Sequence, residues 1–184
     1  HEKFGEGHAE VNAFRSATED VAGATIYVTL EPCSHYGKTP PCSDKIIEKK
    51  TGRVVIAALD PNPLVSGRGV KKLQAAGIEV VTGILAEESS RLNEIFMKYI
   101  VKKEPFVVMK AAMSLDGKIA TRIGESQWIT GPAARERVHQ LRSALTGIMV
   151  GVQNVSMDDP QLTSSIMGGK NPGRIMVDIT LCIP

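Results

Sequence analysis

Residues 24–59 read ATIYVTLEPCSHYGKTPPCSDKIIEKKTGRVVIAAL, and this stretch contains two predicted strands with a predicted helix between them. ATIYVTL is rich in β-branched and aromatic residues, and the apolar run VVIAAL after Arg53 is typical of a strand that is buried on both faces. CSDKIIEKK follows two prolines, which favour the entry of a helix. The order strand, helix, strand predicts parallel pairing and therefore an α/β fold.

The alternation of helices and strands extends beyond this stretch. EVNAFRSATEDV, from Glu10 to about Val21, suits a helix, GVKKLQAAG suits another that is closed by Gly77, and IEVVTGIL suits a strand. AEESSRLNEIFMKYIVKK, residues 86–103, has apolar positions at helical spacing and is followed by a glutamate and a proline. We therefore expect a domain boundary there, with domains at 1–103 and 104–184.

The second domain is predicted to be α/β as well. FVVMKAAMS, which begins at Phe106, is predicted to form a strand, and LDGK is predicted to form the turn that follows. The next segments are predicted as one helix and two strands, in the order PAARERVHQLRSAL, GIMVGV and RIMVD.

Composition narrows the class of protein. The chain has 184 residues, 42% of them hydrophobic, which is enough for one large domain or two modest ones. A net charge of +2 with dispersed basic residues gives no sign of a nucleic-acid surface. Three cysteines, without an apolar signal segment or a run long enough to span a membrane, favour a reducing cytoplasm. We expect a cytoplasmic homo-oligomer that binds neither membranes nor nucleic acids, and we interpret the chain as a fragment, since it begins without methionine and stops after a strand-like run.

Metal-ligating residue types gather around the predicted strand 24–30. A catalytic zinc ion takes three protein ligands and keeps a fourth position for water. His8, Cys33 and Cys42 supply three ligands, and both cysteines follow prolines at the end of a strand or the start of a helix. A helix N-terminus favours thiolate over thiol. Glu10, two residues after His8 at the first helical turn, is the candidate for moving protons beside the metal.

The order of these residues matches a known chemical signature. H-x-E followed by P-C and a second cysteine is the signature of the zinc deaminases, which replace an amino group on a ring carbon by hydrolysis. One alternative is a deaminase of another base, such as a nucleoside, guanine or a tRNA adenosine. A second alternative is a non-catalytic relic that zinc merely stabilises. A structural zinc usually has four protein ligands, and only three are visible here, so the sequence favours catalysis.

HAE, EPCSHYGKTPPC and DPNPLVSGRG together resemble the RibD family, bifunctional deaminase–reductases of riboflavin biosynthesis, and the resemblance covers nearly the whole chain. It implies a cytidine-deaminase-like three-layer α/β/α domain without its N-terminal strands, then the N-terminal part of a dihydrofolate-reductase-like α/β domain. It implies deamination of 2,5-diamino-6-(5-phosphoribosylamino)pyrimidin-4(3H)-one 5'-phosphate, then NADPH-dependent reduction of the ribosyl group to ribityl. By this resemblance Zn²⁺ is held by His8, Cys33 and Cys42, and Glu10 is catalytic.

The resemblance also assigns residues that contact substrate and cofactor. In the first domain it implies four substrate contacts, at His1, His35, Lys38 and Thr39. In the second it implies NADPH contacts at Ala112, Trp128, Asn154 and Asp158, and substrate contacts at Ser126, Arg142 and Leu162. NADPH binding rests on this resemblance alone, because the chain has no G-x-G-x-x-G motif. Ser165 is a departure, since the family tends to place an arginine there.

Overall fold

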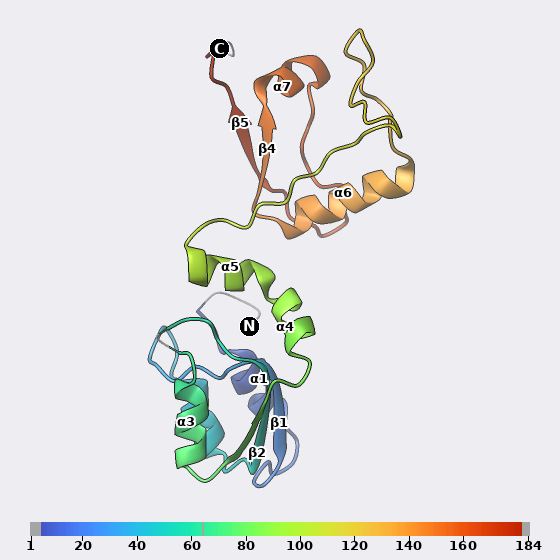
Figure 1. The fold of residues 1–184 in the computed structure, drawn as a ribbon. Helices are drawn as coiled ribbons and strands as arrows, with labels where there is room; N and C mark the ends of the chain where they lie inside the picture. Colours follow the sequence, from blue (N-terminus) through green and yellow to red (C-terminus); the bar gives the residue numbers. More distant parts are fainter. Residues whose placement is uncertain (1–4, 64, 182–184) are drawn as a thin grey trace. The chain divides into compact units, whose positions relative to one another are not determined.

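The computed structural model describes residues 5–63 and 65–181, in which the chain divides into two compact units between Val107 and Val108 (Figure 1). The domain limits 1–103 and 104–184 stay a prediction. Each unit contains helices and strands, so the predicted α/β class is confirmed. None of the helices in the described part of the chain is long and apolar enough to cross a lipid bilayer.

The first unit is built on a sheet of three parallel strands, as the sequence predicts. The strands are β1 (Thr25–Leu30), β2 (Arg53–Ala58) and β3 (Glu79–Thr82), and β2 lies in the middle. Ile26 pairs with Val54 and Val28 pairs with Ile56 across β1 and β2. The central strand is the most deeply buried of the three, in agreement with its unbroken apolar sequence.

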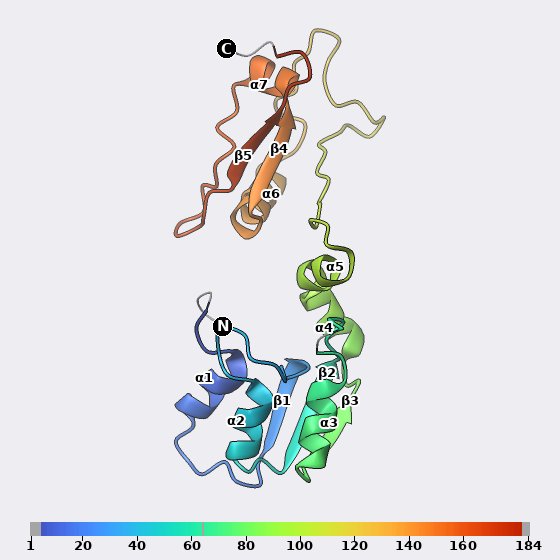
Figure 2. The ribbon, with the colours of Figure 1, turned by 90° about the vertical axis from the view of Figure 1, so that its left-hand side faces the viewer.

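Three helices pack their apolar side chains onto one face of this sheet: α1 (Ala9–Ser16), α2 (Cys42–Glu48) and α3 (Arg68–Ala75). Ile46 of α2 and Leu73 of α3 have no exposed surface and form the core with residues of β2. A fourth helix, α4 (Ala86–Leu92), contacts β2 from the other side (Figures 1 and 2). Its Ser89 hydroxyl donates to the Thr29 carbonyl of β1. Helices on both sides explain why β2 is covered on both faces.

The parallel topology brings several loops to one edge of the sheet. β1 and β2 both end at this edge, and the Glu31 amide donates to the Ala58 carbonyl just beyond them (3.0 Å). Pro32 and Cys33 therefore leave the sheet beside the residues that follow β2. In parallel α/β sheets the carboxyl ends of the strands are the usual place for a functional site.

Two helix predictions in this unit are wrong in their limits. The helix predicted to run to about Val21 ends at Ser16, where Ala17 takes up extended geometry, and the Asp20 side chain then accepts a hydrogen bond from the Ala22 amide (3.1 Å) in a turn. The helix predicted for 86–103 is two helices, α4 and α5 (Glu94–Lys102). Between them, the Asn93 side chain donates to the Ser89 carbonyl (2.9 Å), and Asn93 leaves helical geometry.

The second unit contains a parallel pair of strands, β4 (Gly147–Gly151) and β5 (Gly173–Val177), with the helices α6 (Pro132–Ala144) and α7 (Val152–Asp158). The predicted helix and these two strands are confirmed, whereas α7 was not predicted. The strand predicted from Phe106 is wrong, since 106–114 form no strand and have no strand partner among the described residues. The LDGK turn is present, closed by hydrogen bonds between Ser114 and Lys118, with Gly117 at φ +80°.

Candidate metal centre

His8, Cys33 and Cys42 converge at the edge of the sheet described above. Their candidate ligand atoms all lie within 4.8 Å of one another. The Nδ1 atom of His8 is 3.3 Å from the Cys42 sulfur and 3.7 Å from the Cys33 sulfur. Because residues 25 and 34 positions apart in the chain meet at this point, the cluster is a product of the fold and not of local sequence.

Each of the three side chains is placed by the end of an element. His8 is the N-cap residue of α1, in extended geometry, and its carbonyl accepts the Asn12 amide (3.0 Å). Cys42 is the first residue of α2 and has no exposed surface. Its amide donates to the Cys33 sulfur (3.3 Å), and the next amide, that of Ser43, donates to the Cys33 carbonyl (3.1 Å). The start of α2 therefore fixes both the backbone and the sulfur of Cys33.

The two thiols influence each other's ionisation. A side-chain hydrogen bond with Cys42 lowers the pKa of Cys33 to about 6. The same hydrogen bond, together with burial, raises the pKa of Cys42. Ionisation of Cys33 is therefore favoured over that of Cys42, and a dication at this position would favour loss of both protons.

Glu10 lies beside the cluster without belonging to its three ligands. It is half-buried in the first turn of α1, and its side-chain hydrogen bond and negative charge both contribute to the raised pKa of Cys42. One histidine nitrogen and two cysteine sulfurs form a donor set that zinc prefers, and three ligands leave a position open. The residues present therefore fit a catalytic zinc ion with a carboxylate next to it.

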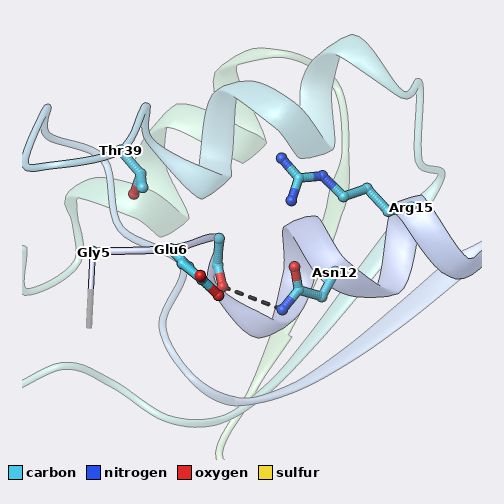
Figure 3. A pocket seen from close by; sticks show the side chains of 6 residues that line it. Gly5, Glu6, Asn12, Arg15 and Thr39 are labelled. Atoms are coloured by element: carbon cyan, nitrogen blue, oxygen red, sulfur yellow. Dashed lines mark hydrogen bonds between the residues drawn. The ribbon is translucent and has the colours of Figure 1, made fainter. Parts of the chain in front are cut away.

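Of the three substrate contacts predicted in the loop between Cys33 and Cys42, only one lines a cavity. Thr39 lines a cavity of about 630 Å³ together with Gly5, Glu6, Gly7, Asn12 and Arg15 (Figure 3). His35 and Lys38 are exposed side chains of the same loop and do not line it. Figure 3 shows Arg15 and Asn12 extending from α1 toward the cavity; neither was predicted. His1 lies outside the described residues.

Two buried carboxylates near the metal cluster were also missed by sequence reasoning. Glu31 is 4% exposed and Asp60 is 7% exposed, although both lie in loops that follow strands. Burial raises the pKa of Asp60, and the nearby charge of Glu31 adds to the rise. Asp60 retains one local partner, because its Oδ1 accepts the Asn62 amide (2.8 Å). The sequence signal was the acidic residue directly after each strand, but burial could not be read from it.

The raised pKa of Asp60 leads to a prediction about stability. A carboxyl group whose pKa is raised by folding favours the folded state only while it is protonated, so this contribution is lost as the pH rises above about 4. Asp60→Asn retains the acceptor oxygen and removes the charge. We expect a Tm about 2–4 °C higher than that of the wild type at pH 7, with a smaller difference toward pH 4. Thermal unfolding followed by circular dichroism measures both.

The control for this substitution is Asp20→Asn. Asp20 makes the same turn with the amide two residues on, but it is exposed. Its substitution should leave the Tm unchanged at every pH. A Tm for Asp60→Asn that is equal to or lower than that of the wild type at pH 7 would contradict the burial argument.

Three of the predicted residues in the second unit form one network. The Ser126 hydroxyl donates to the Asp158 carboxylate (3.3 and 3.4 Å), and the Asn154 amide group donates to the same carboxylate (2.8 Å). Asp158 is the last residue of α7. Two residues predicted to touch NADPH thus lie next to one predicted to touch substrate.

The other predicted residues of this unit are dispersed. Arg142 of α6 donates to the Thr163 carbonyl (3.1 Å), its buried Nε has no hydrogen-bond partner in the structure, and burial lowers its pKa. Leu162, next to Thr163, is buried. Trp128 is 70% exposed, and the Arg135 guanidinium lies 4.4 Å from its ring centroid. Ala112 is half-buried in the irregular segment before the LDGK turn.

Two families match parts of the chain. Residues 2–58 match the cytidine and deoxycytidylate deaminase zinc-binding region, which includes all three residues of the metal cluster. Residues 105–184 match the RibD C-terminal domain. The two matches do not overlap.

Single proteins match the whole chain. It is 55% identical to the riboflavin biosynthesis protein RibD of Actinobacillus pleuropneumoniae, over 100% of this chain and 49% of that protein. It is 51% identical to the riboflavin biosynthesis protein RibD of Aquifex aeolicus, over 100% of this chain and 52% of that protein. A Thermotoga maritima diaminohydroxyphosphoribosylaminopyrimidine deaminase/5-amino-6-(5-phosphoribosylamino)uracil reductase structure matches with a TM-score of 0.90 and 49% identity, over 97% of this chain and 51% of that one. Acinetobacter baumannii RibD matches with a TM-score of 0.91 and 44% identity, over 100% and 53%. The chain spans about half the length of these relatives.

Proposed function

The chain belongs to the RibD family, and from this premise we propose that its first unit is a zinc-dependent deaminase of riboflavin biosynthesis. The observation that carries the proposal is the convergence of His8, Cys33 and Cys42, with the Glu10 carboxylate beside them. The proposed substrate is 2,5-diamino-6-(5-phosphoribosylamino)pyrimidin-4(3H)-one 5'-phosphate. This choice agrees with the name of the matching Thermotoga structure, a diaminohydroxyphosphoribosylaminopyrimidine deaminase.

The proposed reaction is a hydrolysis in which the residues of this chain bind the metal and move protons. His8, Cys33 and Cys42 would hold zinc, which when bound lowers the pKa of water to about 7. Glu10 accepts a proton as a water oxygen bonds to the ring carbon that bears the amino group, and returns it to the ring nitrogen. Glu10 then moves the proton of the new hydroxyl group on that carbon to the amine, the carbon–nitrogen bond breaks, and ammonia leaves the ring as the hydroxyl oxygen becomes a carbonyl.

The loop between the two cysteines is proposed to hold the substrate. Thr39 lines the cavity that Gly7, the residue before His8, also lines. His35 and Lys38 are exposed in the same turn-rich loop, where they can bind a polar ring edge or a phosphate. His1 is proposed as a further contact by resemblance to the family. The exposure of His35 and Lys38 supports a role at the open mouth of the site.

The second unit is proposed to supply part of an NADPH-dependent reductase. The network of Ser126, Asn154 and Asp158 supports this, since it joins two proposed cofactor contacts to a proposed substrate contact. The remaining proposed contacts are Ala112 and Trp128 for NADPH and Arg142 and Leu162 for substrate. The buried, unpartnered Arg142 Nε supports its role, because such a donor is suited to an anionic ligand.

We further propose that the protein is a cytoplasmic homo-oligomer with a small-molecule substrate and no nucleic-acid partner. The exposed apolar side chains of β5, Ile175, Met176 and Val177, support oligomer formation. The net charge of +2 supports the absence of a nucleic-acid partner.

The first test measures bound zinc and ammonia release on the protein as it stands. We expect a stoichiometric amount of zinc by elemental analysis, and ammonia release from the diaminopyrimidine phosphate in a coupled assay. Cytidine, guanine and tRNA serve as alternative substrates. Zinc without ammonia from the diaminopyrimidine phosphate would contradict the proposed activity, and ammonia from one of the others would identify a different deaminase. Absence of zinc would refute the metal centre.

A further inference from the structure

Glu31 is a buried acidic residue whose role the proposed reaction does not explain. It follows β1 directly and precedes Cys33 by two residues. Its side chain is 4% exposed, and none of the ion pairs between described residues includes it. A buried carboxylate without such a partner needs hydrogen bonds to stabilise its charge.

Backbone amides supply these hydrogen bonds. Oε1 accepts the amides of Gly69 (2.9 Å) and Val70 (3.2 Å), and Oε2 accepts those of Asp60 (3.4 Å) and Gly67 (2.9 Å). Three of the four amides lie at the start of α3, where the helix leaves its first amides without intrahelical partners and favours negative charge. One side chain thus ties Asp60 and the start of α3 to the end of β1.

The contact continues from Glu31 to the metal loop through the backbone. A Cβ atom placed on Gly69 would lie 2.2 Å from the Pro32 carbonyl oxygen and 3.1 Å from Glu31 Oε1. Only glycine allows such an approach, so the first turn of α3 lies directly against Pro32. Pro32 is bonded to Cys33, whose sulfur is 3.7 Å from His8 Nδ1.

We propose that Glu31 is a positioning residue of the metal centre. It binds the four amides named above, holds the first turn of α3 against Pro32, and so fixes Cys33 at the separation from His8 and Cys42 that a metal ion requires. Residues that orient metal ligands from outside the coordination sphere commonly affect metal affinity. The role in metal binding rests on the proposed zinc centre, whereas the clamp on α3 can be measured in metal-free protein.

The test compares Glu31→Gln with Glu48→Gln. Glutamine has nearly the same shape, but its NH₂ group would face two of the four amides without accepting from them. Glu48 undergoes the same chemical change on α2, the helix that begins with Cys42, and it is exposed. Hydrogen exchange of the Gly67, Gly69 and Val70 amides is measured without metal. Zinc affinity is measured by competition with a chelator, and the ligand geometry by visible absorption of the Co²⁺-substituted protein.

In Glu31→Gln we expect faster exchange of these amides, zinc affinity about tenfold to a hundredfold lower, and a changed Co²⁺ spectrum. Glu48→Gln should match the wild type in all three measurements. Unchanged amide exchange in Glu31→Gln would overturn the clamp. Faster exchange with wild-type zinc affinity and an unchanged Co²⁺ spectrum would overturn the positioning role.

One further variant, and the amide exchange measured without metal, keep the outcomes distinct. If Glu31→Gln fails to fold by circular dichroism, Glu31→Asp retains the charge on a shorter side chain and should show the same changes at smaller amplitude; wild-type values in that variant would also overturn the proposal. If the wild-type protein takes up no zinc, the proposed function and the positioning role both fail, and the amide exchange still decides the clamp.

Discussion

Glu10→Gln is expected to abolish measurable ammonia release while the protein retains its wild-type zinc content. Glutamine has almost the same shape as glutamate but is neutral, so it cannot accept the proton that leaves the attacking water. General acid–base groups typically contribute about 10²–10⁴-fold to the rate. We expect a loss within this range or larger, because Glu10 is proposed to serve two successive proton transfers. Ammonia release under saturating substrate, measured beside elemental analysis of zinc, tests both parts.

The control for Glu10 is Glu19→Gln, the same change at an exposed position beyond the end of α1. This variant should retain both zinc and turnover. If Glu10→Gln releases ammonia within tenfold of the wild-type rate, another group moves the protons. If it loses zinc as well, Glu10 takes part in holding the metal, and its proposed role is wrong.

The parallel sheet of the first unit could be predicted because its pattern is local. VVIAAL after Arg53 is apolar without interruption, as is typical of a strand that is covered on both faces. The limits of the helices could not be predicted in the same way. α4 stops at Leu92, where the Asn93 side chain bonds to the Ser89 carbonyl, and the predicted continuation of α1 contains a turn in which the Asp20 side chain accepts the Ala22 amide. The amphipathic pattern continues through both positions, so it does not reveal that a side chain there bonds to the backbone in place of a helical hydrogen bond.

The candidate metal cluster could be predicted because its chemistry is carried by residue types. A histidine, two cysteines after prolines and a nearby glutamate are few enough to be recognised together. Glu31 and Asp60 could not be found in this way, since an acidic residue after a strand is usually solvated. Glu31 binds amides 29 to 39 positions away, which approach it only after β1, β2 and α3 have packed.

The second unit shows the opposite case, in which residue types favour a strand that does not form. Residues 106–114 have high β-propensity, yet no described strand hydrogen-bonds with them. Strand geometry is stabilised by a neighbouring strand as much as by its own side chains. The turn after this segment is present as predicted, because it needs only neighbouring residues: a hydrogen bond between Ser114 and Lys118 and the positive φ of Gly117.

Cys42→Ala is expected to reduce zinc affinity by about a thousandfold. Zinc sites in small proteins bind with about 10–16 kcal/mol, so one of three ligands accounts for roughly 4 kcal/mol, or about three factors of ten. The backbone amide of residue 42 can still donate to the Cys33 sulfur in this variant, so the loss reports mainly the missing thiolate. Competition with a chelator of known affinity measures the change.

The control for Cys42 is Ser43→Ala, a change at the next residue of α2. Ser43 is also fully buried, and its hydroxyl has no hydrogen-bond partner in the structure, so its removal should leave zinc affinity unchanged and the Tm equal or higher. Because both variants remove one polar atom from the same buried turn, a general loosening of α2 would weaken zinc binding in both. Zinc affinity that falls equally in the two variants, or in neither, would contradict the role of Cys42 as a ligand.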